Sequence, residues 1–386
     1  MKNQISKICV MIDILPDSGG GFHLAKSICE NIKNQESKKI NFRFLTTYPQ
    51  TKKILEKELK IEIDLFRKES FFNKFFSKLY KIKFFQNFIK FSPLEKYLKN
   101  NIFDSIYFIS PSYLISQCKK FESYYTIWET QFNDISQFPE YKKNTIYLRN
   151  KSFMLAGKYS KKIFVSTNKL ADEVKNLYEI DAKKLVYQPI PPYITSKKFN
   201  ENYTSKNSII NKIIKKKYFF YPAQYWKHKN HEYIVKSIGS MNKEEIDFEI
   251  IFSGHDKGYL NYLITLTKDL GLEKYFTFLN YVNDDDLIYL YKNCFALIVP
   301  SLVGTHTFPL YEGFFFKKPL IYNSKNLDKK FLNNIINLNI DDLESLIKGI
   351  KNLNSKNINQ MIENNFNLNK KNFSNINLLI NHFFES

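Results

Sequence analysis

Cysteine is scarce in this sequence, and its four cysteines lie far apart along the chain. No two of them are close enough in the sequence to indicate a disulfide framework or a zinc site. Scattered thiols are typical of a protein in the reducing interior of a cell. The sequence also lacks any run of 18 uninterrupted apolar residues, so no segment is predicted to span a bilayer. We therefore expect a cytoplasmic protein. The cysteines are Cys9, Cys29, Cys118 and Cys294.

A signal peptide is the alternative that the N-terminus leaves open. Residues 1–15 combine a charged start with a short apolar run, but no small-residue cleavage site follows. Pro16, Asp17 and three glycines come next instead. This pattern favours a buried first strand that enters a glycine turn.

Acidic residues are outnumbered by basic ones, 38 against 58, which gives a formal charge of +20. This excess predicts an anionic partner: nucleic acid, a nucleotide-linked substrate or an acidic membrane surface. Lys, Asn, Ile and Phe are abundant throughout, which weakens the charge as a functional signal. No nucleic-acid recognition motif accompanies it. A chain of 386 residues with 44% apolar and 25% charged residues indicates a globular protein of two domains.

What the sequence does contain is a repeated alternation of apolar strands with amphipathic helices. Strands are predicted at 8–15, 40–46, 104–110, 125–129, 162–166, 184–188, 218–221, 248–253, 275–279, 295–299 and 320–322. Helices are predicted at 22–33, 52–60, 169–178, 232–240, 258–270, 285–293 and 309–317, with a helical tail from about 341. The alternation predicts two α/β domains with doubly wound parallel sheets, and a ligand cleft between their carboxyl ends. The predicted boundaries are 1–195, a linker at 196–216, a second domain at 217–365, and a C-terminal helix at 366–386 that packs back on the first domain.

A basic amphipathic block at 67–99 has two interpretations. Apolar side chains such as Phe72, Phe75, Phe76 and Leu79 recur at three- and four-residue steps with lysines between them. They form either core-facing helices with solvated lysines or a surface that rests on anionic lipid at the inner face of the membrane. The apolar stripe alone does not decide between the two.

The stretch 301–323 organises the second half. It follows an apolar strand, passes through a turn of small residues, opens a helix at Pro309 and carries Glu312 in the first turn of that helix. A strand, a turn rich in backbone N–H groups and a helix N-terminus predict an anion site with one carboxylate beside it.

Three segments, 218–238, 278–302 and 304–323, resemble the GT-B glycosyltransferases, specifically their large retaining group called family 4. They correspond in order to the first strand-loop-helix of the family's donor domain, the segment leading to the nucleotide site, and the signature turn. The likeness extends over nearly the whole chain and is strongest in the second half. It implies the GT-B fold and a nucleoside-diphosphate sugar as donor.

The resemblance implies two leading catalytic residues. Lys229 would balance the charge that grows on the leaving diphosphate. Glu312 would accept hydrogen bonds from the donor's ribose, because a carboxylate offers two acceptor oxygens to a vicinal diol. Relatives often carry an arginine where this chain has Gln224, and an acid where it has Gly304. In relatives the acid at the position of Gly304 often contacts the donor sugar, so the sequence does not predict which sugar is transferred.

Further donor contacts are implied at the other turns. Besides Gln224, Lys229, Gly304 and Glu312, the predicted donor residues are Gly20, Gly21, Gly254, His255, Tyr281, Val282, Thr305, His306, Thr307 and Phe308. In the first half, segment 128–140 resembles a family segment that often holds a histidine near the donor sugar. Phe132 stands at that position here. Glu129, Asn133 and Asp134 are the predicted acceptor or sugar contacts.

No metal site is predicted. The triplet Asp284-Asp285-Asp286 precedes a helix, where acids cap the first turn and favour the helix dipole. The resemblance also implies a metal-independent enzyme without a cofactor.

The sequence thus predicts transfer of a hexose-type sugar, with mannose favoured, to a glycan or lipid-linked glycan in surface polysaccharide or lipopolysaccharide synthesis. Peripheral membrane contact through 67–99 would suit a lipid-linked acceptor, and nucleic acid is not an expected partner. Three alternatives stay open: an epimerase or phosphorylase on the same fold, a nucleic-acid-binding protein argued from charge alone, and a GT-B scaffold that binds nucleotide sugars without catalysis.

Overall fold

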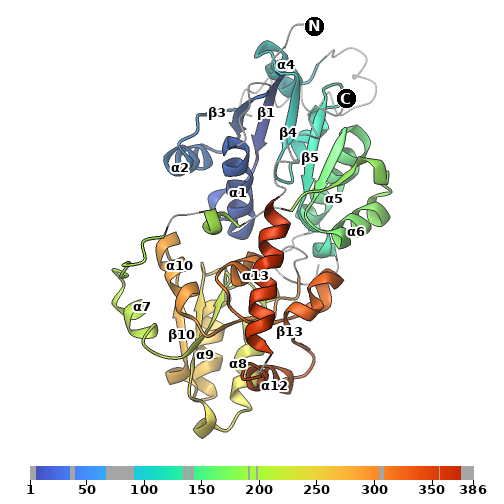
Figure 1. Ribbon diagram of the computed structural model, residues 1–386. Helices are drawn as coiled ribbons and strands as arrows, with labels where there is room; N and C mark the ends of the chain where they lie inside the picture. Colours follow the sequence, from blue (N-terminus) through green and yellow to red (C-terminus); the bar gives the residue numbers. More distant parts are fainter. Residues whose placement is uncertain are drawn as a thin grey trace. The chain divides into compact units, whose positions relative to one another are not determined.

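The computed structural model describes residues 6–34, 40–66, 91–133, 138, 143–189, 192–196, 199–303, 308–355 and 357–374. The chain divides into two compact units (Figure 1). The first contains the described residues up to 189 except Phe138. The second contains Phe138 and the described residues from 192 onwards. The predicted linker and domain boundaries stay predictions.

The first unit is built on a parallel sheet of seven strands in the order β3-β2-β1-β4-β5-β6-β7. Its strands are β1 (Ser6–Ile12), β2 (Ile40–Thr46), β3 (Ile63–Leu65), β4 (Ser105–Phe108), β5 (Ser123–Ile127), β6 (Lys162–Val165) and β7 (Leu185–Tyr187). Its helices are α1 (Gly20–Asn34), α2 (Pro49–Leu59), α4 (Pro93–Asn100), α5 (Lys143–Tyr159) and α6 (Asn168–Tyr178). Strand β1 pairs with β2 on one side and β4 on the other, so the strand order reverses beside β1.

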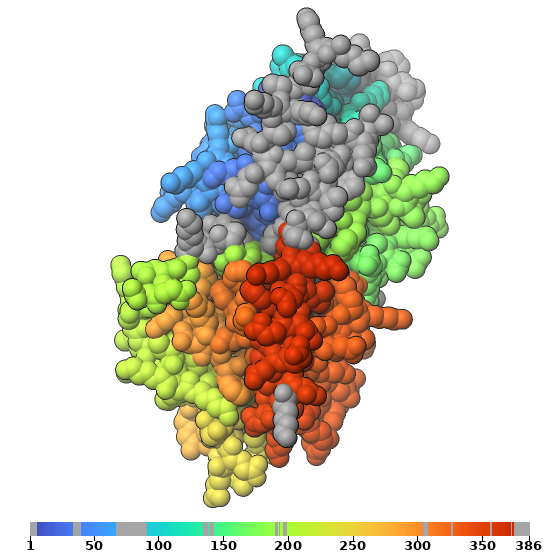
Figure 2. Space-filling view, in the orientation of Figure 1, coloured from blue at the N-terminus to red at the C-terminus, as the bar shows by residue number. Residues whose placement is uncertain are grey.

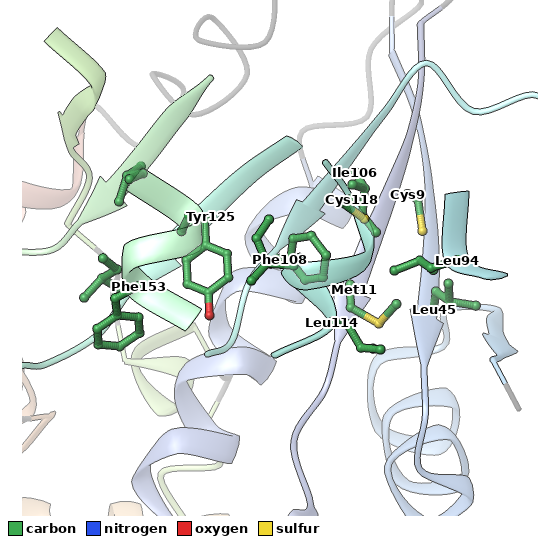
Figure 3. Close-up of a cluster of buried hydrophobic side chains, with 14 of the residues drawn as sticks. Cys9, Met11, Leu45, Leu94, Ile106, Phe108, Leu114, Cys118, Tyr125 and Phe153 are labelled. Carbon is green, nitrogen blue, oxygen red and sulfur yellow. The ribbon is translucent and has the colours of Figure 1, made fainter. Parts of the chain in front are cut away.

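The core of this unit lies on the sheet because its strands are apolar on both faces. Figure 3 shows Met11 of β1, Phe108 of β4 and Tyr125 of β5 gathering with Phe153 of α5. The rings of Phe108 and Tyr125 lie 5.7 Å apart between centroids. Cys9, Cys29 and Cys118 of this unit are free and buried, as is Cys294 of the second unit. This packing fixes the position of each strand, and therefore of the turn that follows its carboxyl end.

The second unit has a six-stranded parallel sheet in the order β10-β9-β8-β11-β12-β13. Its strands are β8 (Tyr218–Pro222), β9 (Glu249–Ser253), β10 (Phe276–Leu279), β11 (Ala296–Val299), β12 (Leu320–Tyr322) and β13 (Ile336–Asn337). Its helices are α7 (Ser208–Ile213), α8 (His231–Gly239), α9 (Leu260–Asp269), α10 (Asp284–Asn293), α11 (Phe308–Phe315), α12 (Glu344–Asn352) and α13 (Ile358–Ser374). The order reverses between β8 and β11, and ligands bind at such a reversal in open α/β sheets.

Helix α13 packs against α11 within the second unit. The Tyr311 and Phe373 rings lie 5.2 Å apart between centroids, and the Asn369 amide donates to the Tyr311 carbonyl at 3.3 Å. The outer side of α13 forms part of the surface of this unit (red in Figure 2). The part of the predicted C-terminal helix at 375–386 lies outside the described residues.

The prediction of two doubly wound parallel sheets is confirmed. Several local predictions were wrong. The first strand is Ser6–Ile12 rather than 8–15, and the helix after it begins at Gly20 rather than at 22. Helix α7 was not predicted, and neither were strands β3 and β13. Most of the 67–99 block lies outside the described residues, which leaves both of its interpretations as predictions. None of the described helices has the length and hydropathy needed to cross a bilayer.

Candidate functional site

Four turns of the second unit are joined at the carboxyl ends of its central strands. After β8, the Tyr225 amide donates to the His255 carbonyl at 3.1 Å, and the Tyr225 hydroxyl donates to the Leu279 carbonyl at 2.7 Å. The Leu302 amide donates to the His228 carbonyl at 2.9 Å. The turns after β8, β9, β10 and β11 therefore form one framework around the β8–β11 reversal.

Lys229 lies in this framework just before helix α8. It ends the short 3-10 turn Lys227–Lys229, and Asn230 with φ of 58° then redirects the chain into the helix. The Tyr221 hydroxyl donates to the Lys229 carbonyl at 3.0 Å, which fixes the backbone of this half-buried lysine. A cation beside the N-terminus of a helix suits an anionic ligand, because both carry positive charge.

Glu312 is buried in α11, on the other side of the reversal. Its Oε2 accepts a hydrogen bond from the hydroxyl of Tyr291 in α10. Burial raises the pKa of Glu312 to about 8, the Tyr291 hydrogen bond works against that rise, and the Asp284 charge adds to it. The carboxyl is therefore poised to change charge near neutral pH, as groups at functional sites often are.

Aromatic side chains line the outer turns. The His255 and Tyr281 rings stack 4.7 Å apart with an interplanar angle of 4°, and Tyr281 is 52% exposed. In the turn after β8, the indole N–H of Trp226 donates to Gln224 Oε1 at 3.0 Å, which orients that predicted donor residue. Val282 is half-buried beside Tyr281. This arrangement offers an exposed aromatic surface next to a fixed amide.

Two of the predicted glycines have packing roles. A Cβ on Gly254 would lie 2.4 Å from the Ala223 carbonyl oxygen, so the turns after β8 and β9 can meet only at a glycine. A Cβ on Gly21 would lie 2.9 Å from the Trp128 ring. Gly20, in the first turn of α1, has open space around it. The contact of these glycines with the donor stays a prediction.

Five predicted residues lie outside the described part of the chain. They are Asp134, Gly304, Thr305, His306 and Thr307. Phe308 is half-buried and begins α11 directly after that turn.

In the first unit, the remaining acceptor candidates already have partners. Glu129 pairs with Arg149 at 3.2 Å, and Asn133 accepts a hydrogen bond from Asn150 at 2.8 Å. Phe132 is buried, and its ring lies 6.1 Å from that of Phe153 between centroids. Phe132 is thus a core residue of this unit.

Sequence reasoning missed a polar cluster at the end of β1. The Asp13 carboxylate accepts hydrogen bonds from the Thr47 hydroxyl and from the Ser112 hydroxyl, the latter at 2.5 Å. The Asp13 amide donates to Ser110 Oγ at 3.0 Å. An acid directly after a buried strand was the available signal. The cluster ties together the turns after β1, β2 and β4.

The aspartate triplet begins α10, as predicted from its position. Asn283 caps this helix by accepting from the Asp286 amide at 2.9 Å. Asp286 itself accepts from the Tyr203 hydroxyl at 3.0 Å. Across the described residues, no three His, Cys, Asp or Glu side chains gather into a group that could hold a metal ion.

Residues 204–329, which include the β8–β11 framework, match the sequence profile of the family described as glycosyl transferases group 1. We call this segment the group 1 domain, after the family whose profile it resembles. Within it lie Gln224, Lys229, Gly254 and Glu312. A curated relative, the O-antigen chain mannosyltransferase RfbU of Salmonella typhimurium (strain LT2), is 24% identical over 196 residues. That match covers 50% of this chain and 50% of the relative.

Several solved structures resemble this chain over most of its length. HepE of Anabaena, solved in complex with UDP and glucose, has a TM-score of 0.72 at 13% identity and covers 98% of this chain and 99% of its own. A glycosyltransferase from Rickettsia africae has a TM-score of 0.68 at 17% identity, covering 98% and 97%. WaaG, a glycosyltransferase involved in lipopolysaccharide biosynthesis, has a TM-score of 0.64 at 13% identity, covering 94% and 95%. The predicted GT-B fold is confirmed.

Proposed function

We propose that the protein is a retaining glycosyltransferase that transfers a hexose-type sugar, with mannose favoured, from a nucleoside-diphosphate sugar. The acceptor is a glycan or lipid-linked glycan of surface polysaccharide or lipopolysaccharide synthesis. The observation that carries the proposal is the position of Lys229 and Glu312, which flank the β8–β11 reversal of the group 1 domain. The names of RfbU and WaaG support the class of pathway, and that of RfbU supports the sugar.

The two flanking residues suit two parts of the donor. Lys229 and the N-terminus of α8 stabilise the negative charge that develops on the leaving diphosphate. Glu312 accepts hydrogen bonds from the ribose hydroxyls. The stacked rings of His255 and Tyr281 provide a flat exposed surface for the base, since bases stack on aromatic side chains. The reaction as proposed uses no metal and no cofactor.

Thermal-shift measurements with UDP, GDP, CDP and dTDP, and with their sugars, test donor binding first. One nucleotide is expected to stabilise the protein, and Lys229→Ala is expected to abolish that shift. Lys227→Ala is the matched control, because Lys227 is an exposed lysine in the same 3-10 turn. No shift with any nucleotide, or equal losses in the two variants, would contradict the donor site.

Turnover is tested by nucleotide release in the presence of lipid-linked and free glycan acceptors, with and without EDTA. Lys229→Ala is expected to lower kcat about a hundredfold or more, the usual effect of removing one group that stabilises a developing anion. Analysis of the anomeric configuration of the product distinguishes retention from inversion.

A non-catalytic GT-B scaffold is the second candidate, and the burial of Phe132 favours it. Phe132 occupies the position at which the GT-B enzymes that this chain resembles often have a histidine. Its side chain lies in the core of the first unit. A scaffold would bind a nucleotide sugar tightly, with no release of nucleotide above the rate of uncatalysed hydrolysis for any acceptor.

A further inference from the structure

Tyr291 is held from two sides in the interior of the second unit. It belongs to α10 and is fully buried. Its ring meets Phe220 of β8 edge to face, with centroids 5.3 Å apart. It also stacks on Phe316, which follows α11, again at 5.3 Å and with an interplanar angle of 21°. Packing on two faces leaves the ring little freedom to rotate or withdraw, so the direction of its hydroxyl is set by the fold.

The hydroxyl of Tyr291 donates to Oε2 of Glu312. A carboxylate has two oxygens, and this bond engages one of them. Within the part of the chain that the structure describes, the Tyr291 hydroxyl is the donor to this carboxylate, which leaves Oε1 for another partner. A side chain held at one oxygen in this way has a fixed orientation at the other.

We propose that Tyr291 is a positioning residue, which anchors Oε2 of Glu312 so that Oε1 and the carboxylate charge are presented to the vicinal hydroxyls of a ribonucleoside diphosphate. This inference rests on the proposed function, because it takes the nucleotide as the ligand of Glu312. It adds a residue that lies 21 positions before Glu312 and does not itself touch the ligand.

The charges around Glu312 make the hydrogen bond important. Asp284, at the start of α10, disfavours a second negative charge at Glu312, whereas the Tyr291 hydroxyl favours the ionised form. The Cys294 thiol lies beside Tyr291 and is also buried. On the α13 side of α11, Glu363 pairs with Lys317 at 2.7 Å. Phe220 and Phe316 contribute only apolar surface. Removal of the Tyr291 hydroxyl therefore removes a group that stabilises the carboxylate.

The test is a calorimetric titration of the full-length protein with the nucleoside diphosphate that stabilises it, at a series of pH values from about 6 to 9. Wild-type affinity is expected to rise with pH as Glu312 loses its proton. Tyr291→Phe keeps the ring packing and is expected to weaken binding about tenfold at pH 7, the effect of one hydrogen bond to a charged group. It is also expected to move the midpoint of the pH dependence upward, a change that altered packing alone does not produce.

Tyr289→Phe is the matched control, since Tyr289 lies on the same helix and its ring packs instead on Phe199 and Tyr203. Glu312→Gln is expected to flatten the pH dependence, and adding Tyr291→Phe to it is expected to have little further effect. If Tyr291→Phe does not fold, 3-fluorotyrosine placed at position 291 keeps the shape, strengthens the donor and is expected to move the midpoint downward.

The results separate this inference from the proposed function. If the wild type binds no nucleoside diphosphate, both fail together. If binding depends on Glu312 while Tyr291→Phe leaves the midpoint and affinity unchanged, only the positioning role is overturned. Equal effects of Tyr291→Phe and Tyr289→Phe would also overturn it.

Discussion

The imidazole of His231 lies against the phenol ring of Tyr221, with the two ring centroids 4.8 Å apart in the interior of the second unit. Tyr225 and Phe252 pack around the same imidazole, which is fully buried. Within the described chain, neither of its ring nitrogens has a partner at hydrogen-bond geometry. Burial lowers the pKa of His231 to about 3, and the nearby Ala223 backbone only partly offsets that effect. This histidine supports the turn that carries Lys229 and stays neutral.

His231→Leu is expected to make the second unit less sensitive to acid. Because the pKa is depressed in the folded state, the unfolded chain binds a proton below pH 6.5 that the folded protein does not take up until about pH 3. Wild-type stability therefore falls as the pH drops through this window, by about 2 kcal/mol at pH 5. The leucine variant lacks this loss. Its stability relative to wild type is expected to rise from pH 7.5 to pH 5.

The two tryptophans allow this measurement in a protein of two units. Trp128 lies in the first unit and Trp226 in the second, so Trp128→Phe leaves a reporter in the second unit alone. Guanidinium unfolding followed by Trp226 fluorescence gives the free energy of unfolding at each pH. Parallel losses for wild type and variant on acidification would show that His231 does not cause them.

In the absence of ligand, the stability of Glu312→Gln relative to wild type is expected to rise with increasing pH, whereas that of His231→Leu rises with decreasing pH. The pKa of the folded carboxyl, about 8, lies above its ordinary value of 4.5. Its contribution to stability is thus fully present below pH 4.5 and is lost as the pH rises towards 8. The glutamine variant avoids that loss, so its advantage over wild type should grow between pH 5 and pH 8, by a few kcal/mol at most. The same Trp226 measurement checks this, and a difference that is constant across the range would contradict it.

The alternation of strands and helices predicted the sheets, because parallel strands buried on both faces are apolar along their length. Helix α5 was missed for a corresponding reason. Its apolar side chains do not form one stripe: Tyr147 and Met154 are exposed, whereas Phe153 is buried beside Ser152. Such a helix is specified by tertiary packing rather than by periodicity.

The sequence predicted individual turns of the candidate site, but it did not predict the contacts between them. The position of Glu312 after a strand and turn pointed to a ligand, but its burial and its bond to Tyr291 depend on how α10 packs against α11. In the sequence, Tyr291 is one more apolar position of a helix. Gly254 was predicted as a donor contact from the family resemblance. Gly254 closely approaches Ala223, which lies 31 positions earlier in the chain, and the local sequence pattern contains no information about this contact.

Gly254→Ala is expected to destabilise the second unit strongly, by about 2 kcal/mol or more. The added Cβ meets backbone atoms of Ala223 and Gln224, which cannot move without disturbing β8. Gly20→Ala is the contrasting substitution in the first unit, where open space surrounds the new methyl. Since alanine favours helix over glycine, that variant should be as stable as wild type or slightly more stable. Unfolding followed through each unit's tryptophan tests both, and a stable Gly254→Ala would disprove the close-packing argument.

Asp13→Ala is expected to destabilise the first unit by about 1–3 kcal/mol, the range for leaving polar partners unsatisfied. The carboxylate holds the Thr47 and Ser112 hydroxyls, and so joins the turns after β2 and β4 to the end of β1. Asp172→Ala is the matched control, because Asp172 is an exposed carboxylate on α6 of the same unit. Unfolding followed by Trp128 fluorescence in a Trp226→Phe background should show a lower midpoint for Asp13→Ala alone. Asp13→Asn, which retains an acceptor oxygen, should lie between the two. Equal stability of the Asp13 and Asp172 variants would mean that the cluster does not contribute to the stability of this unit.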